Sequence, residues 1–519
     1  MLARVRSAAV LGIDAYLVDV ETDVANGLPT FATVGLPQGA VRESRERVFA
    51  AIANTGFTFP LKRVTVNLAP ADIRKDGSAF DLPIAIGVLA ATEQITSIRL
   101  ARVAVLGELG LEGAVRPVRG ALPVALAARA AGIEALVLPR ENLAEAGVVA
   151  GLRVLGAATL TEIADFLDGR TELPAAQVNV TELFAARAAD DVDFAEVKGQ
   201  GHAKRALEVA AAGAHNLLMV GPPGSGKTML ARRLPTILPR MSLDEALETT
   251  KIHSVAGVLP LGESLVARRP FRAPHHTISD AGLIGGGTYP RPGEVSLAHG
   301  GVLFLDELPE FRKNVLEVLR QPLEDGVVTI ARAAMSLAYP ARFMLAAAMN
   351  PCPCGYHGDP RHACACAPLE VQRYLARVSG PLLDRIDIHL DVPAVPYREL
   401  VGKAGGEPSG AIRERVDRAR MVQRERFAGR AGIFANAHMA PRDLRAHCRV
   451  ADGADALLRT AIQRLGLSAR AYHRILKIAR TIADLAGSGG IETVHVSEAI
   501  QYRSLDRRGV TAVVRGSAA

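Results

Sequence analysis

The 519-residue chain is long enough for about three domains, and its hydrophobic share of 49% predicts a globular protein with a sizeable core. It shows no signal-peptide pattern at its start and no uninterrupted apolar run of membrane-spanning length, so we expect a cytoplasmic protein without a membrane partner. The net charge of +7 favours an acidic polymer as partner only weakly, because arginine-rich chains from GC-rich genomes carry the same excess.

Residues 1–170 alternate short apolar stretches with helical patterns, which predicts a separate α/β domain. Residues 171–190 contain Pro174 and have weaker periodicity, so we expect a linker there. The apolar stretches cover residues 15–20, 31–34, 63–68, 103–106 and 135–138, and the helical patterns cover residues 41–53, 81–91, 121–131 and 160–167.

Three segments of this domain, residues 76–83, 107–110 and 115–120, resemble the Lon-protease-type domain of the ribosomal S5 domain-2 fold. Proteases of that type use a Ser-Lys dyad. Here Leu122 stands roughly where the lysine would lie, and Ser78 does not lie in a Gly-Pro-Ser-Ala frame. The resemblance therefore implies a non-proteolytic scaffold or a partner-binding module.

A phosphate-binding loop is predicted at residues 221–228, which read GPPGSGKT between an apolar strand at residues 216–220 and a helical run at residues 229–234. Its glycines let backbone N–H groups turn onto a polyphosphate, Lys227 reaches the β- and γ-phosphates, and Thr228 ligates Mg²⁺. The alternative is an ordinary glycine-rich turn. The predicted ATP-binding residues of the loop are Gly221, Pro222, Pro223, Gly224, Ser225, Gly226, Lys227 and Thr228.

Residues 191–395 as a whole are expected to form an AAA+ ATPase core with a parallel sheet. Upstream of the loop, Val197, Gly199 and Gln200 lie where AAA+ proteins contact adenine. Downstream, an apolar strand ends in Asp306 and Glu307, the Walker B arrangement, in which Asp306 holds Mg²⁺ through water and Glu307 polarises the attacking water. An acidic strand end or helix cap is the alternative.

A third predicted strand, residues 343–349, ends in Asn350, which would orient water and the γ-phosphate as sensor 1 does in AAA+ enzymes. The carboxyl ends of parallel strands meet at one edge of a sheet, where ligands bind.

Residues 382–387 (LLDRID) resemble the arginine-finger box of the magnesium-chelatase and minichromosome-maintenance branch of AAA+ proteins. That resemblance implies that Arg385 acts in trans on the γ-phosphate of a neighbouring subunit. An intrachain ion pair with Asp384 or Asp387 remains the alternative.

Four further boxes, residues 270–279, 285–287, 292–299 and 350–355, are similar to those of the ComM/YifB group of magnesium-chelatase-like AAA+ ATPases, over nearly the whole chain. The resemblance implies a ring, expected as a homo-hexamer, that acts as a helicase on single-stranded and branched DNA. It would drive branch migration during recombination in natural transformation, with a recombinase as a candidate partner. It does not imply metal insertion into porphyrin. A protein-remodelling ATPase with a client-binding N-terminal domain is the alternative function.

Two segments are candidate DNA contacts. His275 and His276 are not predicted as a metal site, because adjacent histidines on one element should point apart; by resemblance they belong to an insert projecting into the ring channel, with Arg268 and Arg272 beside them. In the resembled branch of AAA+ proteins a hairpin precedes the sensor-1 strand, which implies a hairpin within residues 328–341, with arms at 328–330 and 336–339. Arg332 would lie near its tip and read backbone charge. A solvated hairpin without a DNA contact is the alternative.

Four cysteines fall within residues 351–367, an insert of the ATPase core. The pairs Cys352/Cys354 and Cys364/Cys366 are separated by a loop able to fold back, so the sequence predicts a closed, structural Zn²⁺ site. His357 and His362 are alternative ligands, and free thiols or a redox pair are the alternative to a metal.

Residues 396–519 are expected to form the helical lid of the ATPase. The basic run at residues 413–430 is interpreted as a solvated face, with phosphate contact as the sharper alternative. Arg470 opens a long helix and matches the family's sensor 2, which implies contact with the γ-phosphate; a surface arginine is the alternative.

Overall fold

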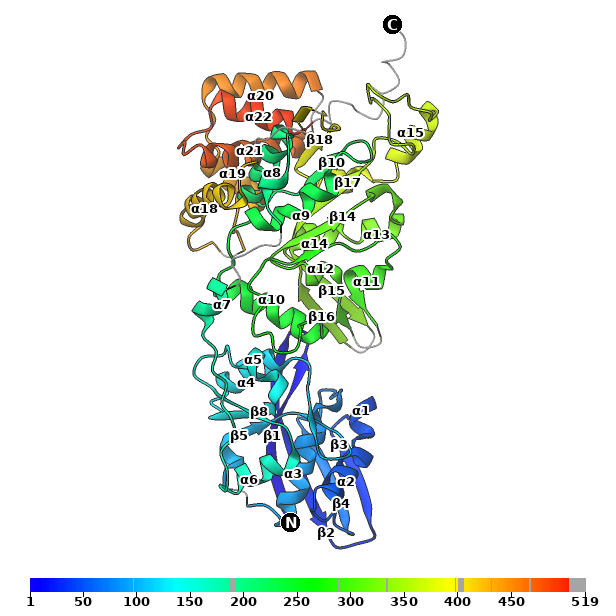
Figure 1. Cartoon of the computed structure of the whole chain (residues 1–519), viewed down its shortest axis with the longest axis vertical. Coiled ribbons are helices and arrows are strands. Elements are labelled where there is room, and N and C mark those ends of the chain that lie inside the picture. Colours follow the sequence, from blue (N-terminus) through cyan, green and yellow to red (C-terminus); the bar gives the residue numbers. More distant parts are fainter. Residues whose placement is uncertain are drawn as a thin grey trace. The chain divides into compact units, whose positions relative to one another are not determined.

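The computed structural model describes residues 1–96, 98–186, 192–287, 290–332, 335–396, 398–399, 406–430, 432–465 and 468–503. The chain forms two compact units (Figure 1). Unit 1 comprises Met1–Ala186, Leu243–Ala267 and Ala331–Tyr339, and unit 2 comprises Arg187–Ser242, Arg268–Ile330 and Pro340–Ala519. Across the described residues, helices of the length and apolarity needed to cross a membrane are absent.

Unit 1 is built on a mixed seven-stranded sheet with the order β3-β4-β2-β1-β5-β8-β9. β1 (Leu2–Leu11) and β2 (Asp14–Ala25) form a long antiparallel hairpin, and β2 also pairs antiparallel with β4 (Arg63–Ala69). The pairs β3–β4, β1–β5, β5–β8 and β8–β9 are parallel. The other strands are β3 (Thr30–Val34), β5 (Val103–Val105), β8 (Ala135–Pro139) and β9 (Arg153–Ala157), with a separate ladder of β6 (Glu108–Leu109) and β7 (Val115–Arg116).

The most apolar helix of unit 1, α3 (Asp81–Ala91), packs against β1 and β2 with all of its residues buried. The predicted helices at residues 81–91 and 160–167 match α3 and α6 at both ends, whereas the one at residues 41–53 is divided at Glu43. The sequence-based prediction misses β1, which carries Arg4 and Arg6 on its exposed face, and β9. The remaining helices are α1 (Gly39–Arg42), α2 (Ser44–Asn54), α4 (Ala121–Ala130), α5 (Leu143–Ala146), α6 (Leu160–Leu167) and α7 (Val180–Ala186).

Two segments from the middle of the chain belong to unit 1. In the first, helix α10 (Leu243–Ala256) packs on α4, and the Ser254 hydroxyl donates to the buried carboxylate of Glu145. Burial raises the pKa of Glu145. The second segment is the outer part of the β15–β16 hairpin. The predicted linker contains α7 within residues 171–186, and residues 187–190 lie outside the described part of the chain.

Unit 2 contains a five-stranded parallel sheet with the order β11-β14-β17-β10-β18. Every residue of β10, β14 and β17 is buried, which explains why these strands read as continuous apolar runs. The parallel α/β sheet predicted for this region is confirmed. Its strands are β10 (Leu217–Val220), β11 (Phe271–Arg272), β14 (Val302–Leu305), β17 (Met344–Met349) and β18 (Ile388–Asp391).

Short elements connect these strands. The hairpin of β15 (Val327–Arg332) and β16 (Met335–Pro340) precedes β17, as expected. The helices are α8 (Gly201–Gly213), α9 (Lys227–Ile237), α11 (Asp280–Ile284), α12 (Glu294–Leu297), α13 (Lys313–Glu317), α14 (Arg320–Asp325), α15 (Pro368–Leu375) and α16 (Gly380–Leu383), with a ladder of β12 (Gly285–Gly286) and β13 (Arg291–Pro292).

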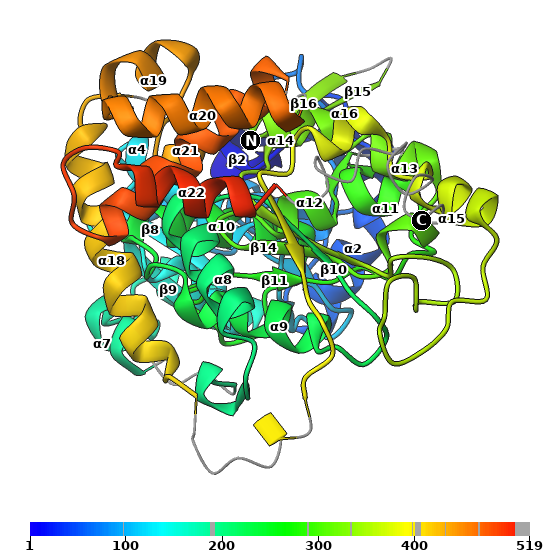
Figure 2. The same ribbon diagram turned by 90° about the horizontal axis from the view of Figure 1, so that it is seen from above.

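The C-terminal helices of unit 2 pack together beside α8 and α9, and α15 lies on the other side of the sheet (Figures 1 and 2). They are α18 (Ser409–Arg426), α19 (Pro441–His447), α20 (Asp452–Leu465), α21 (Ala469–Leu485) and α22 (Thr493–Gln501). Three arginines of the basic run make intramolecular ion pairs, Arg415 with Glu208 and Glu407, Arg426 with Asp484, and Arg430 with Asp443. The run therefore anchors α18 and the turn after it, rather than forming a uniformly solvated face.

Candidate nucleotide site

The loop at residues 221–228 joins the buried strand β10 to helix α9, which begins at Lys227. Gly226 precedes the helix with a positive φ of 87°. At Gly221 a Cβ would lie 2.1 Å from the Val392 carbonyl oxygen, so a side chain cannot replace glycine without moving the neighbouring backbone. The loop therefore has the strand–turn–helix context that phosphate binding requires.

Lys227 lies inside the curve of this loop and is only 8% exposed. Its Nζ donates to the carbonyl oxygens of Gly221 at 2.7 Å and Pro222 at 2.9 Å, and to Asn350 Oδ1 at 3.2 Å. Burial lowers the pKa of Lys227, although the nearby Asp306 carboxylate opposes that shift. The Lys227 ammonium group is thus held between the start of the loop and Asn350.

Thr228 and the two Walker B carboxylates meet at the same edge of the sheet. Thr228 Oγ1 donates to Asp306 Oδ2 at 2.6 Å, so the hydroxyl and carboxylate oxygens that would hold Mg²⁺ are already adjacent. Glu307 has a φ of 52°, a left-handed conformation that is uncommon for a residue other than glycine, and its N–H donates to Asp306 Oδ1. Because of this turn, the side-chain carboxylates of Asp306 and Glu307 point in different directions.

Asn350 directly follows β17, which lies between β14 and β10 in the sheet. This strand order brings Asn350 next to Lys227 and to the end of β14 that carries the Walker B residues. The neighbouring placement expected from the parallel sheet is therefore present. Gln200 also contacts the loop, because its Nε2 donates to the Ser225 carbonyl oxygen at 2.6 Å.

The rest of the predicted adenine-binding segment lies beside Gln200. Val197 is fully buried, and the Lys204 ammonium donates to its carbonyl oxygen. A Cβ at Gly199 would overlap the Glu399 side chain, which closes this segment on one side.

His276 lies next to Glu307, a contact that the sequence-based prediction missed. Its Nδ1 is 3.4 Å from Glu307 Oε2, and its ring is 4.1 Å from the ring of His275. The expectation that these adjacent histidines point apart is wrong, because the chain after β11 is irregular and does not impose alternating directions. The residue pattern Pro-His-His-Thr contains nothing that predicts the contact between His276 and Glu307.

The four cysteines of the insert converge on one point. Their sulfur atoms all lie within 4.8 Å of one another, with Cys352 Sγ 3.3 Å from Cys354 Sγ and 3.7 Å from Cys364 Sγ. Four zinc–sulfur bonds of about 2.3 Å in a tetrahedron would place the sulfurs about 3.8 Å apart. The separations fit such a site, whereas they are too long for disulfide bonds.

The two histidines of the insert are not part of this cluster. His357 contributes its backbone N–H, which donates to Cys352 Sγ, and the His362 ring lies near Asp359 and Tyr356. The donor set is therefore four thiols, which suits a closed structural site.

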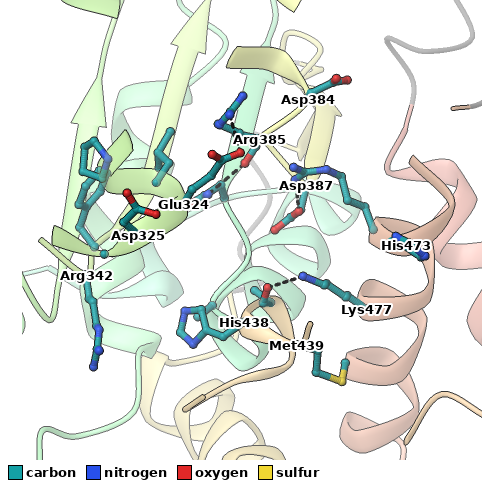
Figure 3. Close-up of a pocket in the computed structure, with 18 of the residues that line it drawn as sticks. Glu324, Asp325, Arg342, Asp384, Arg385, Asp387, His438, Met439, His473 and Lys477 are labelled. Carbon is teal, nitrogen blue, oxygen red and sulfur yellow. Dashed lines mark hydrogen bonds and ion pairs between the residues drawn. The ribbon is translucent and has the colours of Figure 1, made fainter. Parts of the chain in front are cut away.

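Arg385 lies at a different place in unit 2, in a charged cavity of about 670 Å³ between α14, the LLDRID segment and α21 (Figure 3). None of residues 221–228, all of which the structure describes, lines this cavity. The Arg385 guanidinium pairs with Glu324 and donates to the Pro381 carbonyl oxygen at 2.6 Å, while its Nε has no hydrogen-bond partner. The intrachain pairing weighed as an alternative thus exists, but with Glu324 instead of Asp384 or Asp387.

Arg470 lines the same cavity, with its Nη1 3.4 Å from Asp384 Oδ2. One turn later in α21, Arg474 pairs with the buried Asp387. Asp387 also contacts His215, and despite its burial the Arg474 guanidinium and this hydrogen bond lower its pKa. The two acids that flank Arg385 are therefore held by arginines of the C-terminal helices.

The candidate DNA contacts differ in their surroundings. Arg272 forms a bidentate ion pair with Glu294, with both distances 2.6 Å, so its guanidinium is already engaged within the protein. Arg268 also interacts with another group of the protein. Arg332 is exposed at the end of β15, in the outer part of the hairpin that belongs to unit 1.

The residues compared with a Lon-type dyad do not form one. Leu122 is fully buried in α4, and Ser78 donates to the carboxylate of Glu108.

Three family models match separate parts of the chain. The model for the magnesium chelatase subunit ChlI matches residues 193–400, a second one for subunit ChlI of Mg-chelatase matches residues 20–142, and the ChlI C-terminal model matches residues 406–503. Part of the chain is also similar to Lon protease 2 of Bacillus subtilis, with 30% identity over 146 residues that cover 27% of this chain and 26% of the protease.

Two relatives align along the full length. The competence protein ComM of Haemophilus influenzae is 46% identical over 510 residues, and the YifB protein of Salmonella typhimurium is 43% identical over 509 residues. Each alignment covers 98% of this chain and 98% of the relative. With such identity along the whole length, the chain belongs to the ComM/YifB family of magnesium-chelatase-like AAA+ proteins.

Proposed function

We propose that this protein is an ATPase that binds MgATP at the edge of the unit 2 sheet and hydrolyses it. The observation that carries the proposal is the direct contact of Lys227 with Asn350 and of Thr228 with Asp306. Lys227 holds the β- and γ-phosphates, Thr228 and Asp306 hold Mg²⁺, and Glu307 polarises the attacking water. His276 and Asn350 position the groups around that water.

The nucleotide site is completed by a neighbouring subunit in a ring. Support comes from Arg385, whose cavity contains none of the phosphate-binding loop of its own chain. A buried donor without a partner, such as Arg385 Nε, costs free energy that a phosphate oxygen from another subunit offsets. Arg470, in the same cavity, approaches the same phosphate, which gives sensor 2 a role in trans. A hexamer is the ring size that the family resemblance favours.

The motor acts on DNA in competence; the Haemophilus influenzae relative is named a competence protein. We propose translocation along single-stranded and branched DNA, with branch migration as the outcome and the exposed Arg332 tracking the phosphates. The competing function is remodelling of a protein client bound by unit 1, and the similarity to Lon protease 2 favours it. Stimulation of ATP turnover by DNA, and not by unfolded protein, distinguishes the two.

The cysteine cluster holds one structural zinc ion. Cys352, Cys354, Cys364 and Cys366 supply four thiolates and no open position, so the ion would brace the insert and take no part in chemistry.

Substitutions at the nucleotide site should separate binding from hydrolysis. Lys227→Ala should abolish nucleotide binding, because it removes the phosphate contact. Glu307→Gln should keep MgATP binding and lower turnover about 10²–10⁴-fold, because it removes only the polarising carboxylate. Equilibrium binding of a fluorescent nucleotide and phosphate release measure the two effects; undiminished hydrolysis by Glu307→Gln would exclude Glu307 from the reaction.

Mixed rings should show that Arg385 acts in trans. Arg385→Ala alone should bind ATP but hydrolyse it about 10³-fold or more slowly. Mixing it with Lys227→Ala should recover part of the activity, because one subunit then offers an intact loop and its neighbour an intact arginine. Phosphate release is measured across mixing ratios, with subunit exchange verified separately; no recovery in verified mixed rings contradicts a trans role.

Charge reversal at the hairpin should impair the action on DNA only. Arg332→Glu should leave basal ATP hydrolysis intact, weaken DNA binding and abolish branch migration, with the salt dependence of binding reduced by about one unit of slope. Arg445→Glu, at an exposed position in α19, is the control with the same change in charge. If Arg332→Glu unwinds DNA as well as the control does, the hairpin is not the moving contact.

Purified protein should carry about one zinc ion per chain, measured by elemental analysis. Cys352→Ser should lower that content, whereas Cys448→Ser should not, because Cys448 is a lone buried thiol in the C-terminal helices. Protein prepared under reducing conditions without stoichiometric zinc would overturn the zinc assignment.

A further inference from the structure

The cysteine cluster and the nucleotide site are neighbours. Cys352 follows Asn350 after a single proline, so the residue that contacts Lys227 is covalently next to the first thiol of the cluster. Cys352 is fully buried, and the Gly355 N–H donates to its carbonyl oxygen at 3.0 Å. The cluster therefore begins with a tight turn fixed at the end of β17.

This turn lies against the phosphate-binding loop. Gly355 has a positive φ of 87°, and a Cβ at that position would lie 2.6 Å from Pro223 Cδ and 2.8 Å from Pro223 Cγ. Real Cβ atoms do not approach carbon this closely, so the backbone of Gly355 packs directly on the Pro223 ring. The same Cβ would lie 3.9 Å from Asn350 Cγ, so the turn covers both the loop and the sensor residue.

The other end of the cluster is also tied to the site. Helix α15 begins two residues after Cys366, and its Tyr374 is buried beside the Asn350 backbone. From just beyond α15, Arg377 donates to the Pro309 carbonyl oxygen and pairs with Glu310, in the turn that follows Glu307. The insert thus contacts the nucleotide site at the phosphate-binding loop, and the segment that follows it contacts the Walker B turn.

We infer that the four-cysteine insert is a metal-held wall of the nucleotide site, so that zinc and MgATP bind with positive cooperativity. Zinc fixes the turn of Gly355 on Pro223, which keeps the phosphate-binding loop and Asn350 in the arrangement that nucleotide requires. Bound nucleotide in turn holds Pro223 against the turn and slows the opening of the cluster. The inference rests on the nucleotide and zinc sites proposed above, and it predicts that each ligand tightens the other by the same factor.

Transfer of zinc to a chromophoric chelator tests the coupling without measuring activity. A saturating non-hydrolysable ATP analogue with Mg²⁺ should slow zinc release from the full-length protein about fivefold or more. Zinc-stripped protein should bind the same analogue correspondingly more weakly. Lys227→Ala, which lacks the phosphate contact, should release zinc at one rate with and without the analogue.

Two glycines of the insert provide a matched pair of variants. Gly355→Ala should keep its zinc but lose nucleotide affinity, because its methyl group displaces Pro223. Gly358→Ala introduces alanine at a similar φ of 79°, but no atom lies within 4 Å of the added Cβ. This variant should therefore bind zinc and nucleotide as the wild type does. Adding Pro223→Ala to Gly355→Ala should restore affinity, since it removes the overlapping atoms.

The outcomes distinguish failure of the coupling from failure of the proposed nucleotide and zinc sites. Wild-type protein that binds no nucleotide, or holds no zinc, overturns the proposed site concerned and the coupling with it. Wild-type protein that binds both, but releases zinc equally fast with and without saturating nucleotide, overturns the coupling alone. Equal nucleotide affinities for Gly355→Ala and Gly358→Ala would also overturn it.

Discussion

The hydrogen bonds that join the phosphate-binding loop to its two neighbouring strands organise unit 2. Lys227 reaches Asn350 at the end of β17, and Thr228 reaches Asp306 at the end of β14. Both contacts depend on the strand order β14-β17-β10, because only adjacent parallel strands bring these three ends together. The buried apolar strands thus hold a small set of charged and polar groups in place without using any of their own side chains.

Charge is distributed between two separate places in the same unit. Lys227 and the Walker B carboxylates lie at the sheet edge. Arg385 and Arg470 instead line a cavity to which the phosphate-binding loop contributes no residue. Within one chain, the residues proposed to bind MgATP are therefore separate from the arginines proposed to act on it. The proposed ring would account for this separation, because a second chain would then supply the γ-phosphate that the two arginines approach.

The sequence predicted the elements whose chemistry is local. Residues 81–91 form a helix with the predicted ends because the run after Asp81 is apolar and the whole helix is buried. The GKT motif opens the helix after β10, and the DE motif follows β14, as expected. Contacts between distant segments were not predictable in this way. The approach of His276 to Glu307, of Glu324 to Arg385 and of Gly355 to Pro223 arises from folding, and no spacing in the sequence encodes it.

The division of the chain into units was likewise not predictable from the sequence. The segment Leu243–Ala267 follows the phosphate-binding loop in sequence, yet it packs with unit 1, where Ser254 contacts the buried Glu145. The sequence analysis expects residues 191–395 to form one ATPase core, and the sequence of this segment carries no information on which core α10 joins. The polar contact with Glu145 is visible only when both segments are placed in space.

In the proposed ring, MgATP binds between Lys227 of one chain and Arg385 of the next. The most direct measurement is a structure of the assembled protein with Mg²⁺ and a non-hydrolysable ATP analogue. We expect the γ-phosphate within hydrogen-bonding distance of Lys227, with Arg385 of the adjacent subunit released from Glu324 and turned onto the same phosphate. Nucleotide bound with Arg385 still paired to Glu324 in every subunit of a closed ring would contradict it.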